Sequence, residues 1–483
     1  MAETLAKKTF WSSIWSLLDT VINRGVSFTI GVILARILSP TEFGLVGMIL
    51  VFTAICDAFI ESGITNALVR KLDRSDVDFN TGFFCNLLMS LIAYLILFFF
   101  APYISTFYNE PDLELLIKVL GINVILTSMC VVPNAIIIST YNVKSLARIN
   151  FIANTLSGIV AIISAVEGIG VWALIIQPLL ANFIRIICYR ISVKWRLSLN
   201  CTKSSFKYLF DYGTKSLAIG ILGTLFNNLY NLLIGKFFTK QDLGLYTRAN
   251  QFGQMPIGII QSTFQRISVA TFANLQEDRD QLRIVYRKYV HIICFLVFPT
   301  LYLMIVLAKP IILLLLTMKW GQCIIMLQII CVGLAFTPLG VLNLCLLQAI
   351  NRIDYSLKLE IAKKITYFIV IIISFPLGLI PMVIGASFYN FLGTMMNFSC
   401  SKRFLDYQYG DQIKDMGMYL GVSLITSALV YYICSIFILS YVSHILIGVI
   451  LFVTIYLGIS FLLKLQALNY ISELICVVKG CDR

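Results

Sequence analysis

Long apolar blocks alternate with short polar connections along the whole chain. The block "LLMSLIAYLILFFF" at residues 87–100 is typical, because it is continuous and carries no charge. A membrane-spanning helix needs about 20 predominantly apolar residues, whereas the strands of an outer-membrane barrel alternate apolar and polar positions. The pattern therefore predicts an all-α integral membrane protein and argues against a barrel.

These blocks predict about fourteen transmembrane helices. With boundaries set to within about four residues, the helices lie near 12–37, 43–68, 80–105, 113–139, 147–166, 170–190, 210–236, 243–270, 286–308, 323–349, 357–377, 380–400, 415–439 and 443–464. The connections carry turn residues, as in "LSPTEFG" at 38–44 and "YNEPDL" at 108–113.

Two polar stretches, 191–209 and 401–414, have the character of linkers. They divide the chain into two six-helix lobes and a C-terminal pair of helices. The predicted domains are an N-terminal lobe at 1–194, a cytoplasmic linker at 195–209, a second lobe at 210–402, and a linker with the last two helices at 403–483.

Composition and charge sharpen this picture. Of 483 residues, 59% are hydrophobic and 13% are charged, against about 45–50% and about 25% in a soluble domain. This excludes a soluble enzyme, a disordered scaffold and a disulfide-rich secreted domain, and we expect no nucleic-acid partner for the net charge of +13.

With the N-terminus inside, 27 Lys and Arg residues fall in cytoplasmic segments and five in external loops, so both termini are predicted to be cytoplasmic. No cleavable signal peptide is expected, because the first apolar stretch is too long for one.

Few residues suggest catalysis or metal binding. The 13 cysteines are scattered without metal-ligand spacing, and the two histidines, His291 and His444, are far apart. No glycine-rich nucleotide-binding motif occurs and no external loop is long enough for a catalytic domain. We therefore expect no enzyme activity, no metal and no cofactor; transport would draw on an H+ or Na+ gradient, the membrane potential or the substrate's own gradient.

An internal repeat links two hairpins. Residues 37–48 read "ILSPTEFGLVGM" and residues 237–248 read "FFTKQDLGLYTR", at an offset of 200. The polar positions in the adjoining helices also repeat, at steps of three and four that place them on one helix face. Repeats separated by six spans keep one orientation, which indicates two pseudo-twofold-related lobes with a substrate path between them.

Charged residues lie inside the predicted spans. Arg24 is roughly 18 Å from the cytoplasmic end of its helix, and Asp57 is roughly 21 Å from the external end of the next one, at similar depth. Asp19 and Glu61 lie about one turn nearer the cytoplasm. A buried ion rarely faces lipid. An Arg24–Asp57 bridge that fastens the two helices and a water-filled transport cavity are both compatible with this pattern.

Two stretches carry a family resemblance. Residues 33–71 ("ILARILSPTEFGLVGMILVFTAICDAFIESGITNALVRK") and 233–283 ("LIGKFFTKQDLGLYTRANQFGQMPIGIIQSTFQRISVATFANLQEDRDQLR") resemble the polysaccharide repeat-unit flippases of bacterial inner membranes. These are the O-antigen, colanic-acid and teichuronic-acid exporters of the multidrug/oligosaccharidyl-lipid/polysaccharide superfamily. The resemblance implies two six-helix lobes around a central cavity that move an undecaprenyl-diphosphate-linked oligosaccharide by alternating access, for surface polysaccharide export.

The resemblance also implies roles for the intramembrane polar residues. A diphosphate cargo needs cations near the middle of the membrane, and its sugars need amide side chains. The predicted substrate-binding residues are Arg24, Arg248, Arg185, Asn23, Asn227 and Asn231. The predicted counter-charges or coupling sites for a cation are Asp57, Glu61 and Asp19. The expected partners are the lipid-linked oligosaccharide, membrane lipids and the polysaccharide polymerase machinery.

Three alternatives remain open from the sequence. The first is a cation-coupled drug or metabolite exporter on the same fold, in which Asp57 and Glu61 bind the cation or a basic drug. The second is a flippase for lipid-linked cell-wall precursors. The third is a membrane polymerase or glycosyltransferase, which the short external loops disfavour.

Overall fold

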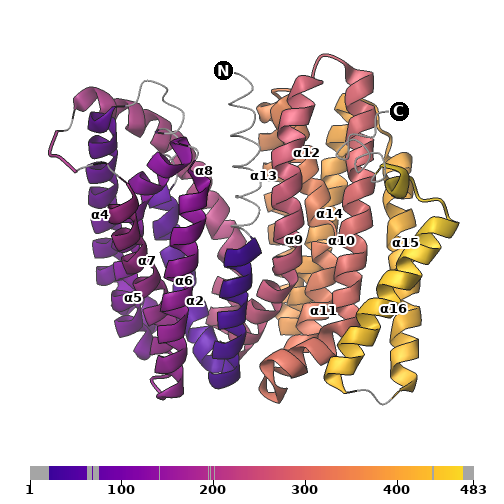
Figure 1. The fold of residues 1–483 in the computed structure, drawn as a ribbon, viewed down its shortest axis with the longest axis horizontal. Helices are drawn as coiled ribbons and strands as arrows, with labels where there is room; N and C mark the ends of the chain where they lie inside the picture. Colours follow the sequence, from indigo (N-terminus) through magenta and orange to yellow (C-terminus); the bar gives the residue numbers. More distant parts are fainter. Residues whose placement is uncertain are drawn as a thin grey trace. The chain divides into compact units, whose positions relative to one another are not determined.

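The computed structural model shows a protein built from α-helices (Figure 1). It describes residues 21–61, 68, 75–140, 142–193, 195, 197–200, 202–437 and 440–470. Over these residues the regular structure is helical throughout, with two short 3-10 segments and no strand. The prediction of an all-α fold is confirmed.

The described helices fall into two compact units, Met1–Thr247 and Arg248–Arg483. The first unit holds a helix at 21–37, α2 (Pro40–Glu61), α4 (Asp76–Tyr108), α5 (Asp112–Ser139), α6 (Val143–Val166), α7 (Trp172–Ser192), α8 (Lys203–Phe237) and the first turns of α9 (Lys240–Asn274). The second unit holds the rest of α9, α10 (Arg279–Leu316), η1 (Met318–Trp320), α11 (Cys323–Leu334), α12 (Thr337–Ala349), α13 (Ile353–Ser374), η2 (Phe375–Leu377), α14 (Leu379–Leu405), α15 (Tyr409–Ile436) and α16 (Tyr441–Leu462). The division into two six-helix lobes and a C-terminal pair stays a prediction.

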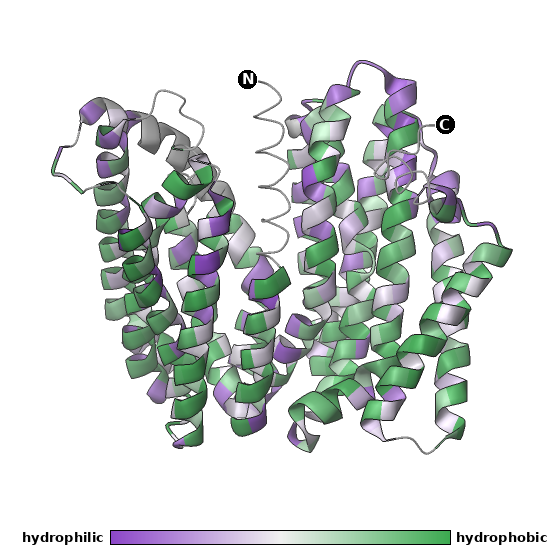
Figure 2. Cartoon of the chain, in the orientation of Figure 1, coloured by the Kyte–Doolittle hydropathy of each residue, from purple (hydrophilic) through white to green (hydrophobic). Residues whose placement is uncertain are grey.

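Membrane-spanning character is strong across both units. Among the described residues, ten segments are helical, long and apolar enough to cross a membrane. Figure 2 shows hydrophobic residues along most of the length of these helices, with many hydrophilic residues toward helix ends and connections. The chain is therefore a multi-pass membrane protein, whereas the count of fourteen spans stays a prediction.

The largest difference from the predicted boundaries concerns α10. We expected this helix at 286–308, but it runs from Arg279 to Leu316 and contains Pro299 and Pro310. The polar segment before residue 286 continues the helix beyond its apolar part, and Lys309-Pro310 does not end it. Proline is tolerated inside membrane helices because neighbouring groups can satisfy the freed backbone carbonyl. Composition alone therefore misplaced both ends.

The two hairpins of the predicted repeat have equivalent structures within the first unit. The helix that precedes each motif ends at residue 37 or at Phe237, and the next helix begins at Pro40 or Lys240. Ser39 and Glu42 form reciprocal cap hydrogen bonds, with Ser39 N donating to Glu42 Oε2 at 2.7 Å. Thr239 and Asp242, which lie 200 residues later in the chain, form the same pair of hydrogen bonds. This pairing of N-cap and N3 side chains satisfies backbone donors that a helix start leaves open.

The two glycines of the repeat explain why it is built this way. A Cβ atom at Gly44 would lie 1.7 Å from the carbonyl oxygen of Lys240, and one at Gly244 would lie 1.9 Å from the carbonyl oxygen of Pro40. The starts of α2 and α9 therefore cross backbone to backbone, each through the glycine of its own motif. Only glycine allows so close an approach.

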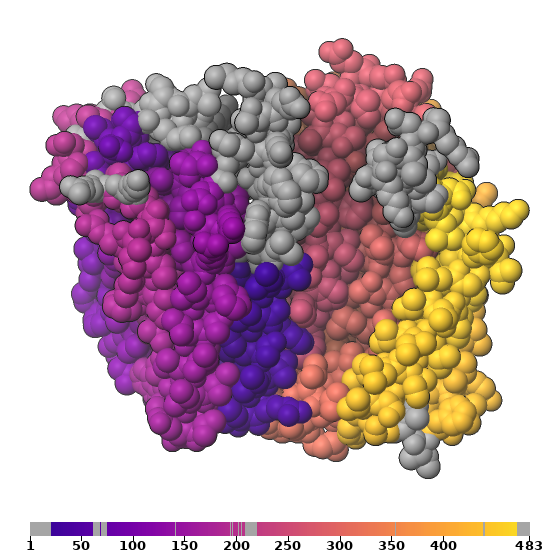
Figure 3. Space-filling model, viewed as in Figure 1, coloured from indigo at the N-terminus to yellow at the C-terminus, as the bar shows by residue number. Residues whose placement is uncertain are grey.

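The packing of each unit follows from its apolar helix faces. In the first unit α4 packs on α5, α6 on α7, and α8 on α2. In the second unit α10 packs against α11, α15 and α16, and α14 packs against α11 and α13. Figure 3 shows α16, in yellow, lying across the surface of the second unit.

Candidate functional site

A cluster of amide side chains surrounds one arginine inside the first unit. Arg185 of α7 donates from Nη1 to Asn182 Oδ1 at 2.6 Å and from Nη2 to Asn154 Oδ1 at 2.7 Å. Asn182 lies one turn before Arg185 on the same helix, while Asn154 comes from α6. We call this set, with the residues that orient the two amides, the arginine–amide cluster.

Further polar side chains fix the orientation of both amides. Asn154 Nδ2 donates to Asn23 Oδ1 of the helix at 21–37, at 3.1 Å. Asn182 Nδ2 donates to Asn123 Oδ1 and Thr127 Oγ1 of α5, at 3.0 and 2.9 Å. Each amide therefore turns its oxygen toward the guanidinium and its nitrogen toward another helix, so four helices position one cation.

The electrostatics of this cluster differ from those of an ion pair. Among the residues that the structure describes, no carboxylate forms an ion pair with Arg185, and its Nε donates no hydrogen bond. Arg185 is only half-buried. Amide oxygens satisfy guanidinium donors but do not cancel the charge. The cluster thus presents an uncompensated positive charge inside an apolar unit, which is an arrangement suited to an anion.

The structure brings together two of the predicted substrate-binding residues, Arg185 and Asn23, through Asn154. Arg24, next to Asn23 in sequence, is exposed. On α8, Asn227 is exposed, and Asn231 Nδ2 donates to Asn228 Oδ1 at 3.3 Å. Among the described residues no hydrogen bond joins Arg24, Asn227 or Asn231 to the arginine–amide cluster, and their roles stay predictions.

The remaining predicted residues have separate environments. Arg248 belongs to the second unit, is 5% exposed and donates to Gln251 Oε1. Asp57 is half-buried on α2. The part of the chain that the structure describes contains no ion pair between Arg24 and Asp57. Their interaction stays a prediction. Asp19 and the side chain of Glu61 lie outside the described residues.

Sequence reasoning missed Asn154, Asn182 and Asn123. Each is an amide inside a long apolar block, which is a signal that was visible in the sequence. The predicted amides lie on the faces shared by the repeated helices, whereas these three lie on helices outside the repeated hairpins. Their positions within apolar blocks indicate buried polar groups but do not indicate their mutual contacts.

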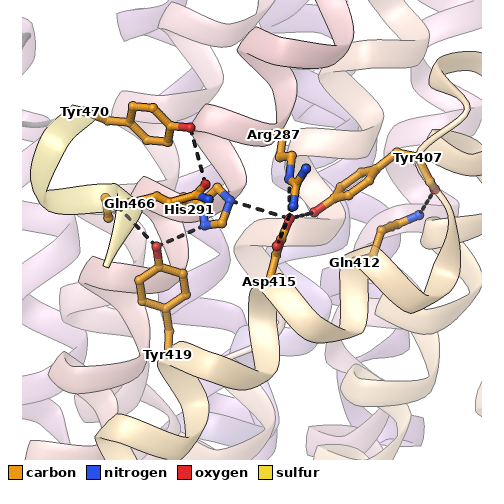
Figure 4. A network of polar contacts seen from close by, with 9 residues as sticks. Arg287, His291, Tyr407, Gln412, Asp415, Tyr419, Gln466 and Tyr470 are labelled. Carbon is orange, nitrogen blue, oxygen red and sulfur yellow. Dashed lines mark hydrogen bonds and ion pairs between the residues drawn. The ribbon is translucent and has the colours of Figure 1, made fainter. Parts of the chain in front are cut away.

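A second polar network, in the second unit, joins α10 to α15 (Figure 4). Arg287 makes a two-point ion pair with Asp415, from Nε to Oδ2 at 2.5 Å and from Nη2 to Oδ1 at 2.9 Å. Tyr407 also donates its hydroxyl to Asp415 Oδ2, at 2.6 Å. His291 Nε2 lies 3.5 Å from the same carboxylate oxygen and its Nδ1 lies 2.9 Å from the Tyr419 hydroxyl. Here the arginine is neutralised by a buried carboxylate.

Tyr407 lies in the connection between α14 and α15, outside the membrane-spanning helices. Burial raises the pKa of its phenol, and the hydrogen bond to Asp415 acts in the same direction. The phenol therefore stays protonated near neutral pH and can donate to the carboxylate. This network fastens helices together and leaves no free charge for a ligand.

The chain matches a known family over most of its length. The family model described as "Polysaccharide biosynthesis protein" matches residues 33–325. This range contains both repeated hairpins and the arginine–amide cluster except for Asn23.

Three curated relatives come from different bacteria. The lipopolysaccharide biosynthesis protein WzxC of Escherichia coli is 24% identical over 438 residues, which cover 89% of this chain and 88% of its own length. The succinoglycan biosynthesis transport protein ExoT of Rhizobium meliloti is 24% identical, over 66% of this chain and 65% of its own length. The teichuronic acid biosynthesis protein TuaB of Bacillus subtilis is 23% identical, over 60% of each chain.

Solved structures share the fold. A lipid II flippase MurJ structure superposes with a TM-score of 0.74 at 14% identity, covering 94% of this chain and 100% of that chain. A multidrug resistance MATE family transporter of the MOP superfamily superposes with a TM-score of 0.62 at 16% identity, covering 80% of this chain and 98% of that one. At these identities the likeness establishes the fold, which is that of membrane transporters.

Proposed function

Because the chain belongs to the polysaccharide biosynthesis protein family, we propose that it translocates undecaprenyl-diphosphate-linked oligosaccharide repeat units across the bacterial inner membrane. Translocation proceeds by alternating access and supplies the export of a surface polysaccharide. The observation that carries the proposal is the uncompensated guanidinium of Arg185, held by Asn154 and Asn182 inside an apolar unit.

The proposed cargo has the chemistry that this cation requires. A diphosphate must be drawn into a low-dielectric region, where a positive charge without a carboxylate partner is most effective. A guanidinium also offers paired N–H donors that match two phosphate oxygens. The buried Nε of Arg185 makes no hydrogen bond among the described residues, and a diphosphate that enters the cluster would supply an acceptor for it. Arg24 and Arg248 would add further positive charge along the path.

The sugars need different partners. Hydroxyl groups both donate and accept hydrogen bonds, as amide side chains do. Asn23, Asn227 and Asn231 are the amides predicted to contact them. Asp57, Glu61 and Asp19 would act as counter-charges or as the site of a coupling cation, H+ or Na+.

The proposed setting follows from the same reasoning. Both termini would lie in the cytoplasm, since this places most basic residues inside. Repeat units would be passed to polysaccharide polymerase machinery on the far side of the membrane. The protein would act by binding and conformational change, without catalysis.

A strain that lacks the gene tests this function. Undecaprenyl-linked repeat units should accumulate in the membrane and surface polysaccharide should disappear, and the wild-type gene should reverse both changes. Accumulation of a cell-wall precursor instead would establish the cell-wall flippase alternative. Unchanged glycolipids with increased sensitivity to basic drugs would establish the exporter alternative.

A variant pair connects the function to the cluster. Arg185→Ala should fail to complement the deletion, whereas Arg190→Ala should complement it, since Arg190 is an exposed arginine in the last turn of the same helix. Membrane levels of both variants, measured by immunoblot, control for insertion. Full complementation by a well-inserted Arg185→Ala protein would contradict the role of the cation.

A further inference from the structure

A cavity of about 220 Å³ with a mixed apolar and amide lining lies in the second unit. Residues of α12, α13 and α14 line it, together with Gln261 of α9. Most ligand sites measure about 300–1,000 Å³, so this cavity suits a single sugar residue and not a whole repeat unit. Its lining is rich in amides, which include Asn343, Asn390 and Asn397.

One of these amides has a buried oxygen that accepts no hydrogen bond within the described part of the chain. Asn343 is 1% exposed, and its Nδ2 donates to the carbonyl oxygen of Leu339 at 3.1 Å. Its Oδ1 accepts no hydrogen bond from any described residue. A buried acceptor without a donor is costly, and a ligand hydroxyl at this position would satisfy it. The wall of the cavity therefore contains a desolvated acceptor that no described residue satisfies.

The walls of the cavity are shaped around the amides. A Cβ atom at Gly340 would lie 2.8 Å from Asn397 Nδ2, so this glycine lets the amide approach α12. The Tyr389 ring packs against Tyr367, with centroids 4.7 Å apart, which fixes an aromatic surface at the cavity edge. An aromatic face together with amide groups matches a pyranose, which has apolar C–H faces and a rim of hydroxyls.

Charge in the cavity is balanced. Glu360 and Lys363 of α13 both line it and form an ion pair with each other. The carboxylate can still accept hydrogen bonds from hydroxyl groups, and the ammonium can still donate. A neutral ligand is therefore favoured over a diphosphate, which would face the carboxylate.

We propose that this cavity is a binding subsite for one neutral sugar residue of the lipid-linked cargo, a hexose or an N-acetylhexosamine. Asn343 Oδ1 accepts a hydroxyl hydrogen, Asn390 and Asn397 contact neighbouring hydroxyls, and Tyr389 packs on the ring. The proposal rests on the proposed function, since it assigns the sugar part of the same cargo. The diphosphate and the sugar are then recognised by chemically different sites.

Lipid competition measured by native mass spectrometry tests the subsite. The purified full chain in detergent is mixed with equal concentrations of undecaprenyl diphosphate and of the glycolipid extracted from the deletion strain. Wild-type protein should bind the glycolipid preferentially. Asn343→Leu and Asn390→Leu should each lower the ratio of bound glycolipid to bound undecaprenyl diphosphate, by about tenfold for Asn343.

Asn86→Leu is the matched control, since Asn86 of α4 is a fully buried asparagine of the first unit that lies outside the cavity. Its ratio should equal that of the wild type. Undiminished binding of undecaprenyl diphosphate to each variant shows that the variant is folded.

Each other result has a defined consequence. Wild-type protein that binds neither lipid would overturn the proposed function and the subsite with it. A wild-type preference that survives in both Asn343→Leu and Asn390→Leu would overturn the subsite and leave the function standing. Equal loss of both lipids in these two variants would also overturn it, because the cavity would then not select the sugar.

Discussion

Arg185 in the first unit and Arg287 in the second unit are both arginines held by two-point hydrogen bonding, yet their partners differ. Arg185 bonds two neutral amide oxygens, whereas Arg287 bonds both oxygens of Asp415. The first arrangement orients a cation and leaves its charge intact. The second cancels the charge and fastens two helices. The nature of the acceptor therefore separates a binding group from a structural one.

The surroundings of the two acceptors reinforce the difference. Asp415 also receives the Tyr407 hydroxyl and lies beside His291, so both its oxygens accept hydrogen bonds from within the network. The side-chain nitrogens of Asn154 and Asn182 donate to other amides, which holds their oxygens in place for Arg185. In the Arg287 network the cation is paired with a carboxylate, whereas in the arginine–amide cluster the buried Arg185 Nε donates no hydrogen bond to a described residue.

Removal of the structural arginine should have the largest effect on stability. Arg287→Ala leaves Asp415, only 5% exposed, without its ionic partner. Loss of one member of a buried pair costs ~3–5 kcal/mol. Because the Arg287 side chain is 40% exposed, we expect the low end, about 3 kcal/mol. Unfolding in detergent measures this change.

Transport per folded molecule should stay close to wild type in Arg287→Ala. Arg283→Ala, one turn earlier on α10, is the control and should change stability little. A transport defect that exceeds the loss of folded protein would mean that the second network also serves the cargo.

The next largest effect is expected when the amide-bound Arg185 is converted into an ion pair like that of Arg287. Asn182→Asp places a carboxylate beside Arg185 while it preserves the side-chain shape. The new ion pair should cancel the available charge, so transport should fall about tenfold or more, which corresponds to about 1.4 kcal/mol. The substitution also removes the Nδ2 donor to Asn123 Oδ1 and Thr127 Oγ1, so transport is normalised to the amount of folded protein. The amount of surface polysaccharide in a strain that expresses the variant at wild-type level measures the effect. A normal amount would show that the charge of Arg185 is not needed for transport.

Loss of one hydrogen bond in the second network should have the smallest effect. Tyr407→Phe removes a donor to Asp415, at a cost of about 1 kcal/mol at neutral pH. Burial raises the pKa of Tyr407 in the folded protein, so the protonated phenol stabilises the fold fully below about pH 10, the unfolded pKa. That contribution declines as pH rises above this value. The stability difference between wild type and variant should therefore narrow at alkaline pH, and a constant difference would contradict this sign.

The fold and one repeat were accessible from the sequence because their signals are local. Apolar blocks indicate the spans, and the twelve-residue motif indicated a repeat of two hairpins, which the structure builds with matching helix starts at Pro40 and Lys240. The same motif marked Gly44 and Gly244, although their crossing depends on two segments 200 residues apart. The end of α10 was misplaced because Pro310 is compatible with a helix in this setting.

The candidate site was only partly accessible, because it depends on contacts between distant segments. Arg185 and Asn23 were predicted as binding residues, but the amide that joins them, Asn154, lies 131 positions from Asn23. Arg287 and Asp415, 128 positions apart, are an equally distant pair. A single sequence shows that such residues are polar, and does not show which of them meet.

Affinity for undecaprenyl diphosphate tests most directly whether Arg185 presents an available cation. The dissociation constant is measured for purified wild type, Arg185→Ala, Arg185→Lys and the control Arg190→Ala. A lost hydrogen bond to a charged group costs ~1.5–3 kcal/mol, so Arg185→Ala should bind at least about tenfold more weakly. Arg185→Lys should be intermediate, since an ammonium lacks the two-point geometry, and Arg190→Ala should equal the wild type. Equal affinity of folded Arg185→Ala and wild type would contradict the account.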